Sequence, residues 1–189
     1  MPDLELNAAT TAVVLIDLQQ GIIARQVAPH SAADVILRAA NLADRFRQAG
    51  SPIVFVRVDL ANIIRPTADV PLSAPSAPPP PPSASELVAE LRRLPTDLVV
   101  TKRFWDAFIN TDLERHLRER NIRTIVLGGI STNIGVESTA RTAAALGFDV
   151  VLVEDVTSSM SEEAHRFSIA NIYPRLGRVR TANELQVRP

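Results

Sequence analysis

Three groups of residues that could carry chemistry each follow or end a short apolar run. Asp17 follows TAVVLI, Lys102 ends DLVVTK, and the glycine-rich segment GISTNIG follows RTIVLG. A carboxyl group can donate or accept a proton, a nearby lysine lowers its pKa, and the N-terminus of a helix can bind an anion. Asp17 alone would be explained by capping a turn. Its combination with Lys102 and the glycine-rich turn favours a site for acid–base chemistry.

The chain contains no cysteine, and its three histidines are far apart in sequence. Disulfides, thiolate metal ligands and a cysteine nucleophile are therefore excluded, which fits a reducing compartment. His30, His116 and His165 are expected on a loop and two helices, without a recognisable ligand cluster. The glycine spacing also differs from G-x-G-x-x-G. The sequence thus predicts no metal site and no cofactor.

The composition is that of one folded domain. The chain has 189 residues, of which 46% are hydrophobic, so we expect a single domain over residues 1–189. Its formal net charge is −1 and it has no dense Lys/Arg run, so nucleic acid is not an expected partner. The N-terminal segment lacks a signal-peptide pattern, and no apolar run approaches bilayer length. We therefore expect a cytoplasmic protein that binds a small molecule and no membrane.

Short apolar runs separated by amphipathic segments would position these residues. Strands are expected at residues 11–17, 52–58, 97–102, 123–129, 149–155 and 177–181. Five of these runs lack polar alternation, which is typical of parallel strands buried on both faces. Helices are expected at residues 31–50, 110–121, 133–146 and 161–172. Ser31 is the predicted N-cap of the first helix, and its apolar stripe comprises Val35, Ala39, Leu42 and Phe46.

This pattern predicts an α/β fold, specifically a Rossmann-like three-layer α/β/α sandwich around a six-stranded parallel sheet. In such sheets, ligands bind beyond the carboxyl ends of the strands, where Asp17, Lys102 and the glycine-rich turn are expected. Residues 66–85 contain eight prolines, so we expect neither strand nor helix there. We interpret this insertion as a polyproline II surface spacer, with a lid or a subunit contact as the alternative.

Four motifs occur in the order found in the isochorismatase-like cysteine hydrolase superfamily, which the chain resembles over nearly its whole length. They are LIDLQ at residues 15–19, K-R-x-x-x-A-F-x-x-T-x-L from Lys102, GISTNIGVESTAR at 129–141, and H-x-x-x-x-x-x-I-x-P-R from His165. The resemblance implies the strand order 3-2-1-4-5-6, with the expected strands numbered along the chain. It also implies a cis peptide bond between Ile130 and Ser131, and a homo-oligomer, either a dimer or a tetramer.

The resemblance further implies a catalytic set. Asp17 matches the acid/base, Lys102 matches its cationic partner, and Gly135 stands where the family has its nucleophilic cysteine. The backbone N–H groups of Ser131 and Gly135 would face a developing oxyanion, beside an empty volume in place of the thiol. Without a thiol, no thioester can form. The implied function is hydrolysis of a vinyl ether or a related C–O or C–N bond in a small metabolite, with Asp17 as general acid or base.

The resemblance leaves one alternative open, a catalytically degenerate member that serves as a ligand-binding or scaffold protein. The expected substrate-binding residues are Gln19, Trp105, Phe108, Ile130 and Ser131. Arg57 and Arg65 could hold carboxylates, although solvated arginines would explain them equally well. Ser131 is a poor candidate for a nucleophile, because its surroundings fail the G-x-S-x-G pattern and no histidine is placed to activate it.

Overall fold

The computed structural model describes residues 3–71 and 78–189. Its strands are β1 (Leu4–Asn7), β2 (Thr11–Ile16), β3 (Ile53–Val58), β4 (Leu98–Lys102), β5 (Thr124–Ile130), β6 (Asp149–Ser158), β7 (Arg178–Arg180) and β8 (Leu185–Arg188). Its α-helices are α1 (Gln20–Ile23), α2 (Ala32–Gln48), α3 (Leu113–Glu119), α4 (Glu137–Ala145), α5 (Glu162–Phe167) and α6 (Tyr173–Leu176). Short 3-10 helices are η1 (Ala8–Thr10), η2 (Pro82–Ser85), η3 (Ala89–Leu91) and η6 (Ala182–Glu184), and π-helical turns are η4 (Thr132–Val136) and η5 (Ser168–Ile172).

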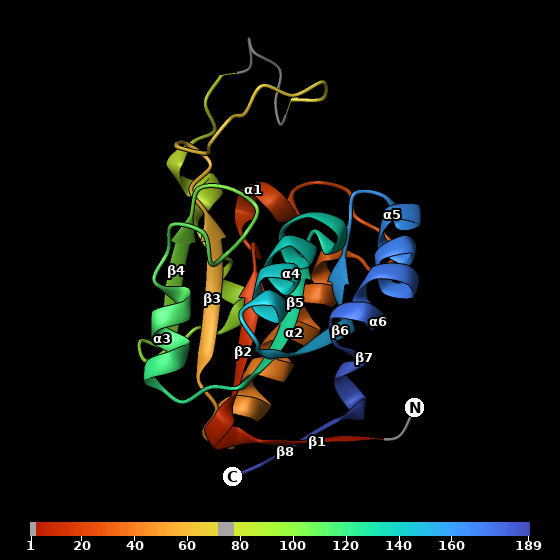
Figure 1. Ribbon diagram of the computed structural model, residues 1–189. Coiled ribbons are helices and arrows are strands. Elements are labelled where there is room, and N and C mark those ends of the chain that lie inside the picture. Colours follow the sequence, from red (N-terminus) through yellow and green to blue (C-terminus); the bar gives the residue numbers. More distant parts are fainter. Residues whose placement is uncertain (1–2, 72–77) are drawn as a thin grey trace.

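The central sheet has six parallel strands in the order β4-β3-β2-β5-β6-β7, with helices on both faces (Figure 1). This confirms the α/β/α prediction and the strand order that the resemblance implied. The small parallel pair β1–β8, which joins the two ends of the chain, was not predicted. Its strands have four residues each, too few to show a clear pattern.

Each face of the sheet packs against its own set of helices. On one face, Val13 and Leu15 of β2 share a core cluster with the apolar stripe of α2, as predicted, and the side chain of Ser31 caps α2 by accepting from the Asp34 amide. On the other face, Val14 and Ile16 lie in a second cluster with residues of α3, α4 and α6. Because β2 is buried on both faces, the residue at its end is held between two packed layers.

Several predicted elements have different bounds in the structure. The helix expected at residues 110–121 is the shorter α3, and the helix expected at 133–146 begins as the π-helical turn η4 and continues as α4. The helix expected at residues 161–172 is α5 followed by the π-helical turn η5, and the strand expected to end at residue 155 continues to Ser158. The Pro-rich insertion also ends in the 3-10 helix η2, so the prediction of no helix there was wrong for these four residues. The described part of the chain has no helix of the length and apolarity that crossing a membrane requires.

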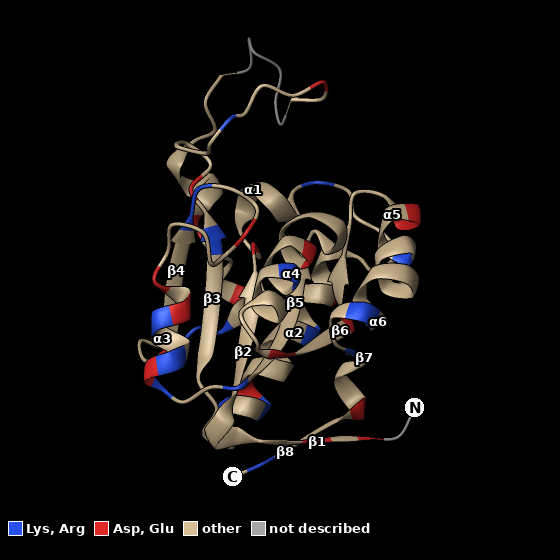
Figure 2. Cartoon of the chain, viewed as in Figure 1, with Lys and Arg blue, Asp and Glu red and all other residues tan. Residues whose placement is uncertain are grey.

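Basic and acidic positions follow one another along α3 (Figure 2). On α3, Arg115 pairs with Glu119 at 3.2 Å and Arg118 pairs with Glu114 at 3.4 Å. Such exposed pairs four residues apart each stabilise a helix by about 0.3–0.5 kcal/mol. The buried pair of Asp17 and Lys102 is of a different kind and lies at the carboxyl ends of the strands.

Candidate active site

Asp17 lies directly after β2 and is held in an unusual backbone conformation. Its φ is +54°, in the left-handed region that few non-glycine residues adopt. Its amide donates to the Val56 carbonyl at 2.8 Å, which fixes it to β3. On the other side, a Cβ at Gly129 would lie 2.1 Å from the Ile16 carbonyl oxygen, so only glycine allows β5 this close. Neighbouring strands thus fix the place from which the Asp17 side chain projects.

Lys102 reaches Asp17 from the end of β4, across β3. Its strand pairs with β3, with Lys102 opposite Val58, and β3 separates it from β2. The Lys102 ammonium lies 2.8 Å from Asp17 Oδ2 and donates to the Trp105 carbonyl at 2.5 Å. The residue is 1% exposed. The sequence predicted that these two residues would meet at the strand ends, and the structure forms a buried ion pair from them.

The electrostatics of this pair favour proton exchange near neutral pH. Burial raises the pKa of Asp17 to about 6. The charge and hydrogen bond of Lys102, and to a smaller extent the nearby Val58 backbone amide, oppose that rise. Oδ2 faces Lys102, whereas Oδ1 has no hydrogen-bond partner among the described residues. A buried oxygen without a partner is costly unless a ligand supplies one. Asp17 therefore has one carboxyl oxygen whose capacity to form hydrogen bonds is unused within the described residues.

Gly135 lies beside both members of the pair, in the π-helical turn η4 that follows β5. A Cβ at this position would be 3.1 Å from Asp17 Oδ2 and 3.2 Å from Lys102 Nζ. A Cβ would therefore fit only after small shifts of its neighbours, and the empty volume expected where a thiol would project stays a prediction. The peptide bond between Ile130 and Ser131 is cis, as expected.

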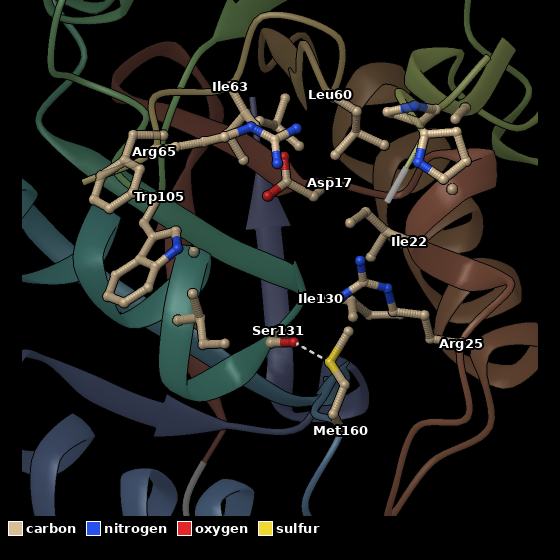
Figure 3. Close-up of a pocket in the computed structure, with 18 residues that line it drawn as sticks. Asp17, Ile22, Arg25, Leu60, Ile63, Arg65, Trp105, Ile130, Ser131 and Met160 are labelled. Atoms are coloured by element: carbon tan, nitrogen blue, oxygen red, sulfur yellow. Dashed lines mark hydrogen bonds between the residues drawn. The ribbon is translucent and has the colours of Figure 1, made fainter. Parts of the chain in front are cut away.

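A pocket of about 300 Å³ opens above Asp17 and has a largely apolar wall. Figure 3 shows Trp105, Ile130 and Ser131 around it, and these three of the expected substrate-binding residues do line it. Other lining residues are Gly21, Ile22, Arg25, Val58, Leu60, Ile63, Arg65, Pro78, Pro80, Ala84, Phe104, Ile134, Gly135 and Met160. The pocket has the size and the mixture of apolar wall and few polar groups that suit a small metabolite.

Gln19 and Phe108 do not line this pocket, which corrects the expectation that they bind substrate. Gln19 is fully buried; its amide nitrogen donates to the carbonyls of Val58 and Ala84, and its amide oxygen accepts from the Val58 amide. It joins β3 to η2. Phe108 is 8% exposed and stacks on Phe148 in the core cluster of α3 and α4.

The structure places one of the two candidate arginines in the pocket and agrees that Ser131 is a poor nucleophile. Arg65 lines the pocket, whereas Arg57 donates to Thr101 and lies outside the lining. The Ser131 hydroxyl donates to the sulfur of Met160 at 2.7 Å. The nearest histidine interaction in this turn involves the neighbouring Thr132, whose hydroxyl lies 2.8 Å from His165 Nδ1. In the described part of the chain, no base therefore contacts the Ser131 hydroxyl.

Several functional candidates were missed by the sequence analysis. The end of the Pro-rich insertion lines the pocket through Pro78, Pro80 and Ala84. The favoured interpretation of residues 66–85 as a surface spacer was therefore wrong for this end of the insertion. Residues 72–77 lie outside the described part. Arg25 and Met160 also line the pocket. Arg25 and Met160 come from loops that no motif marked. The only signal that the insertion could contact the pocket was its place in the sequence after β3, the strand that pairs with β2 next to Asp17.

Two of the histidines, expected to lie apart, meet at a carboxylate. His30 Nε2 and His165 Nε2 lie 3.1 Å and 3.4 Å from Glu154 Oε1. These three groups offer the nitrogen and oxygen ligands that divalent transition metals bind. Their hydrogen bonds lower the pKa of Glu154 to about 2, with the bond from His165 as the largest cause. His165 is buried, whereas His30 and Glu154 are partly exposed, and none of the three lines the pocket.

Comparisons with known proteins agree with this geometry. The model of the isochorismatase domain matches residues 11–184. The isochorismatase family protein YecD of Escherichia coli O157:H7, whose function is uncharacterised, is 49% identical over 186 residues, covering 96% of this chain and 97% of YecD. The ureidoacrylate amidohydrolase RutB of Variovorax paradoxus is 39% identical over 100 residues, covering 52% of this chain and 40% of RutB.

A solved structure extends the likeness to the fold. The isochorismatase family protein of Burkholderia thailandensis is 42% identical and superposes with a TM-score of 0.88, covering 97% of this chain and 96% of that protein. The matched region contains Asp17, Lys102 and Gly135. On these matches and the sheet order, the chain belongs to the isochorismatase family.

Proposed function

We propose that this protein is a hydrolase that cleaves a small metabolite without a covalent intermediate, with Asp17 as the general acid. The observation that carries the proposal is the buried Asp17 carboxyl in the pocket lining. One of its oxygens is held by Lys102, and the other has no hydrogen-bond partner among the described residues. Its pKa of about 6 leaves a fraction protonated at neutral pH. A group with a pKa near the working pH transfers protons efficiently.

Hydrolysis of a vinyl ether fits this arrangement. The Asp17 carboxyl gives its proton to the terminal carbon of the enol ether, and the other carbon becomes an oxocarbenium ion. Water adds to that carbon and returns a proton to Asp17, and the resulting hemiketal breaks into an alcohol and a carbonyl compound. Lys102 lies 2.8 Å from the carboxylate that forms in the first step, so it stabilises the charge as the charge develops.

Gly135 supports a mechanism without a thioester. We infer that it occupies the position of the cysteine used by amide-cleaving relatives, because it lies against both Asp17 and Lys102. The chain has no cysteine at any position that could serve as the nucleophile instead. The likeness to RutB, an amidohydrolase, extends over about half of this chain and makes related C–N bonds worth testing as substrates.

A substrate screen with two matched variants tests the proposal. Wild type, Asp17→Asn and Asp149→Asn are assayed against vinyl ethers, amides and imides; Asp149 is an exposed aspartate at the opposite end of the sheet. Asp17→Asn keeps the volume but loses the transferable proton, so we expect its turnover to fall by about 100-fold or more, whereas Asp149→Asn stays normal. Near-normal turnover by folded Asp17→Asn would contradict the proposal. Ligand binding by wild type without turnover would instead favour the degenerate binding protein.

A further inference from the structure

Thr132 connects the pocket to the group formed by His30, Glu154 and His165. It is the first residue of η4, the turn that carries Gly135, and follows Ser131 in the pocket wall. Thr132 is fully buried and held at two points. Its carbonyl accepts from the Tyr173 hydroxyl at 2.7 Å, and its hydroxyl lies 2.8 Å from His165 Nδ1.

The positions of the protons in this group follow from Arg38. A guanidinium can only donate, so its contact with His30 Nδ1 at 3.2 Å makes that nitrogen an acceptor. In the neutral imidazole, His30 Nε2 therefore carries the proton and donates to Glu154. Glu154, whose pKa is lowered to about 2, is an acceptor for both histidines.

The same reasoning sets the direction of the bond to Thr132. His165 Nε2 faces the Glu154 carboxylate and so carries the proton, which leaves Nδ1 of the neutral ring as an acceptor. The Thr132 hydroxyl then donates to His165. A metal ion would need the lone pair of His30 Nε2, and Arg38 opposes the tautomer that frees it. The group is therefore better explained as a hydrogen-bonded relay than as a metal centre.

We propose that Glu154 and His165 are positioning residues that act through Thr132 to hold Ser131 and Gly135 against Asp17. The catalytic part of this inference rests on the proposed function, whereas the proton arrangement does not. Glu154 fixes the tautomer and orientation of His165, His165 fixes the Thr132 side chain, and Tyr173 fixes its carbonyl. A turn held this firmly keeps Gly135 next to Asp17. A Cβ built on Gly135 would lie 3.1 Å from Asp17 Oδ2.

Two substitutions at Thr132 separate positioning from simple packing. Thr132→Val keeps the shape but removes the hydroxyl, whereas Thr132→Ser keeps the hydroxyl and serves as the conservative rescue. We expect Thr132→Val to lower kcat by about 10-fold or more with little change in KM, because small displacements of reacting groups are costly. Thr132→Ser should stay within about 3-fold of wild type. A folded Thr132→Val with unchanged kcat would overturn the positioning role.

Two NMR measurements decide the question without a substrate. Imidazole ¹⁵N shifts should show His165 protonated at Nε2, with a hydrogen-bonded Nδ1 that loses its donor in Thr132→Val. The pKa of Asp17, followed through its ¹³C carboxyl resonance, should shift by about 0.5 unit or more in Thr132→Val and stay constant in Thr132→Ser. An Nδ1–H tautomer, or an unchanged Asp17 pKa in Thr132→Val, would overturn the proposal. So would stoichiometric Zn²⁺ binding that moves the His30 and His165 resonances.

If wild type proves inactive in the substrate screen, the proposed function fails while these two NMR results still test the relay. If wild type is active and the imidazole tautomer is wrong, the relay fails while the role of Asp17 stands. The two proposals are therefore tested separately.

Discussion

Removing the charge of Lys102 should raise the pKa of Asp17. The ammonium and Asp17 Oδ2 are 2.8 Å apart, so at an effective dielectric constant of about 20 their attraction is about 6 kcal/mol. That energy corresponds to about 4 pKa units and is a ceiling, because water and local dipoles compensate for a lost charge. Opposite charges at this range usually lower a carboxyl pKa by about 1–3 units. We therefore expect the Asp17 pKa to rise from about 6 by at least about 1 unit when the charge is removed.

Two variants separate the charge of Lys102 from its hydrogen bond to Trp105. Lys102→Gln keeps a donor for the Trp105 carbonyl, whereas Lys102→Met removes both the donor and the charge. The ¹³C carboxyl resonance of Asp17 is titrated in each variant, and circular dichroism confirms folding. Both variants should show the raised pKa, and Lys102→Met should also be less stable, since the partly buried Trp105 carbonyl loses its partner. An Asp17 pKa that stays at the wild-type value in folded Lys102→Gln would refute the electrostatic account.

Three further predictions test neighbouring parts of the account. Gly135→Cys should fold with a lowered Tm, because its Cβ would lie only 3.1–3.2 Å from Asp17 and Lys102. Its thiol should react with iodoacetamide faster than the thiol of the exposed control variant Ala145→Cys. An inert thiol would indicate that Gly135 serves packing alone. Activity should survive both EDTA and alkylating agents, since the chain has no thiol; loss that zinc restores would reveal a metal site. Gln19→Leu should lower the free energy of unfolding in urea by about 2–4 kcal/mol, because the amide and carbonyl of Val58 lose buried partners, and leave KM unchanged. A raised KM with normal stability would restore Gln19 as a substrate contact.

The sheet and its central pair could be predicted because their signals are local. Apolar runs without alternation mark the buried strands, and parallel strands place their carboxyl ends at one edge, so Asp17 and Lys102 had to lie near each other. The strand order came from the resemblance, since no run of residues encodes its neighbour in the sheet. The left-handed backbone of Asp17 had no sequence signal, because its type and neighbours also suit an ordinary turn.

The remaining parts of the site depend on contacts between distant segments. Gln19 follows Asp17 by two residues, so its sequence position suggested substrate contact, but the carbonyls it binds belong to Val58 and Ala84. His30 and His165 are brought together only when the loop before α2 reaches the end of β6. Such groupings require the folded backbone, and a single sequence shows only the separate residues.

The most direct measurement of the central claim is the pH dependence of kcat/KM for the best substrate found in the screen. A general acid must be protonated, and burial places the pKa of Asp17 at about 6. Because the protonated fraction falls tenfold per unit above the pKa, kcat/KM should fall as pH rises above about 6, with the midpoint higher in Lys102→Gln. A rate that instead rises with pH through this range, or a midpoint unmoved in Lys102→Gln, would contradict the assignment of Asp17 as the general acid.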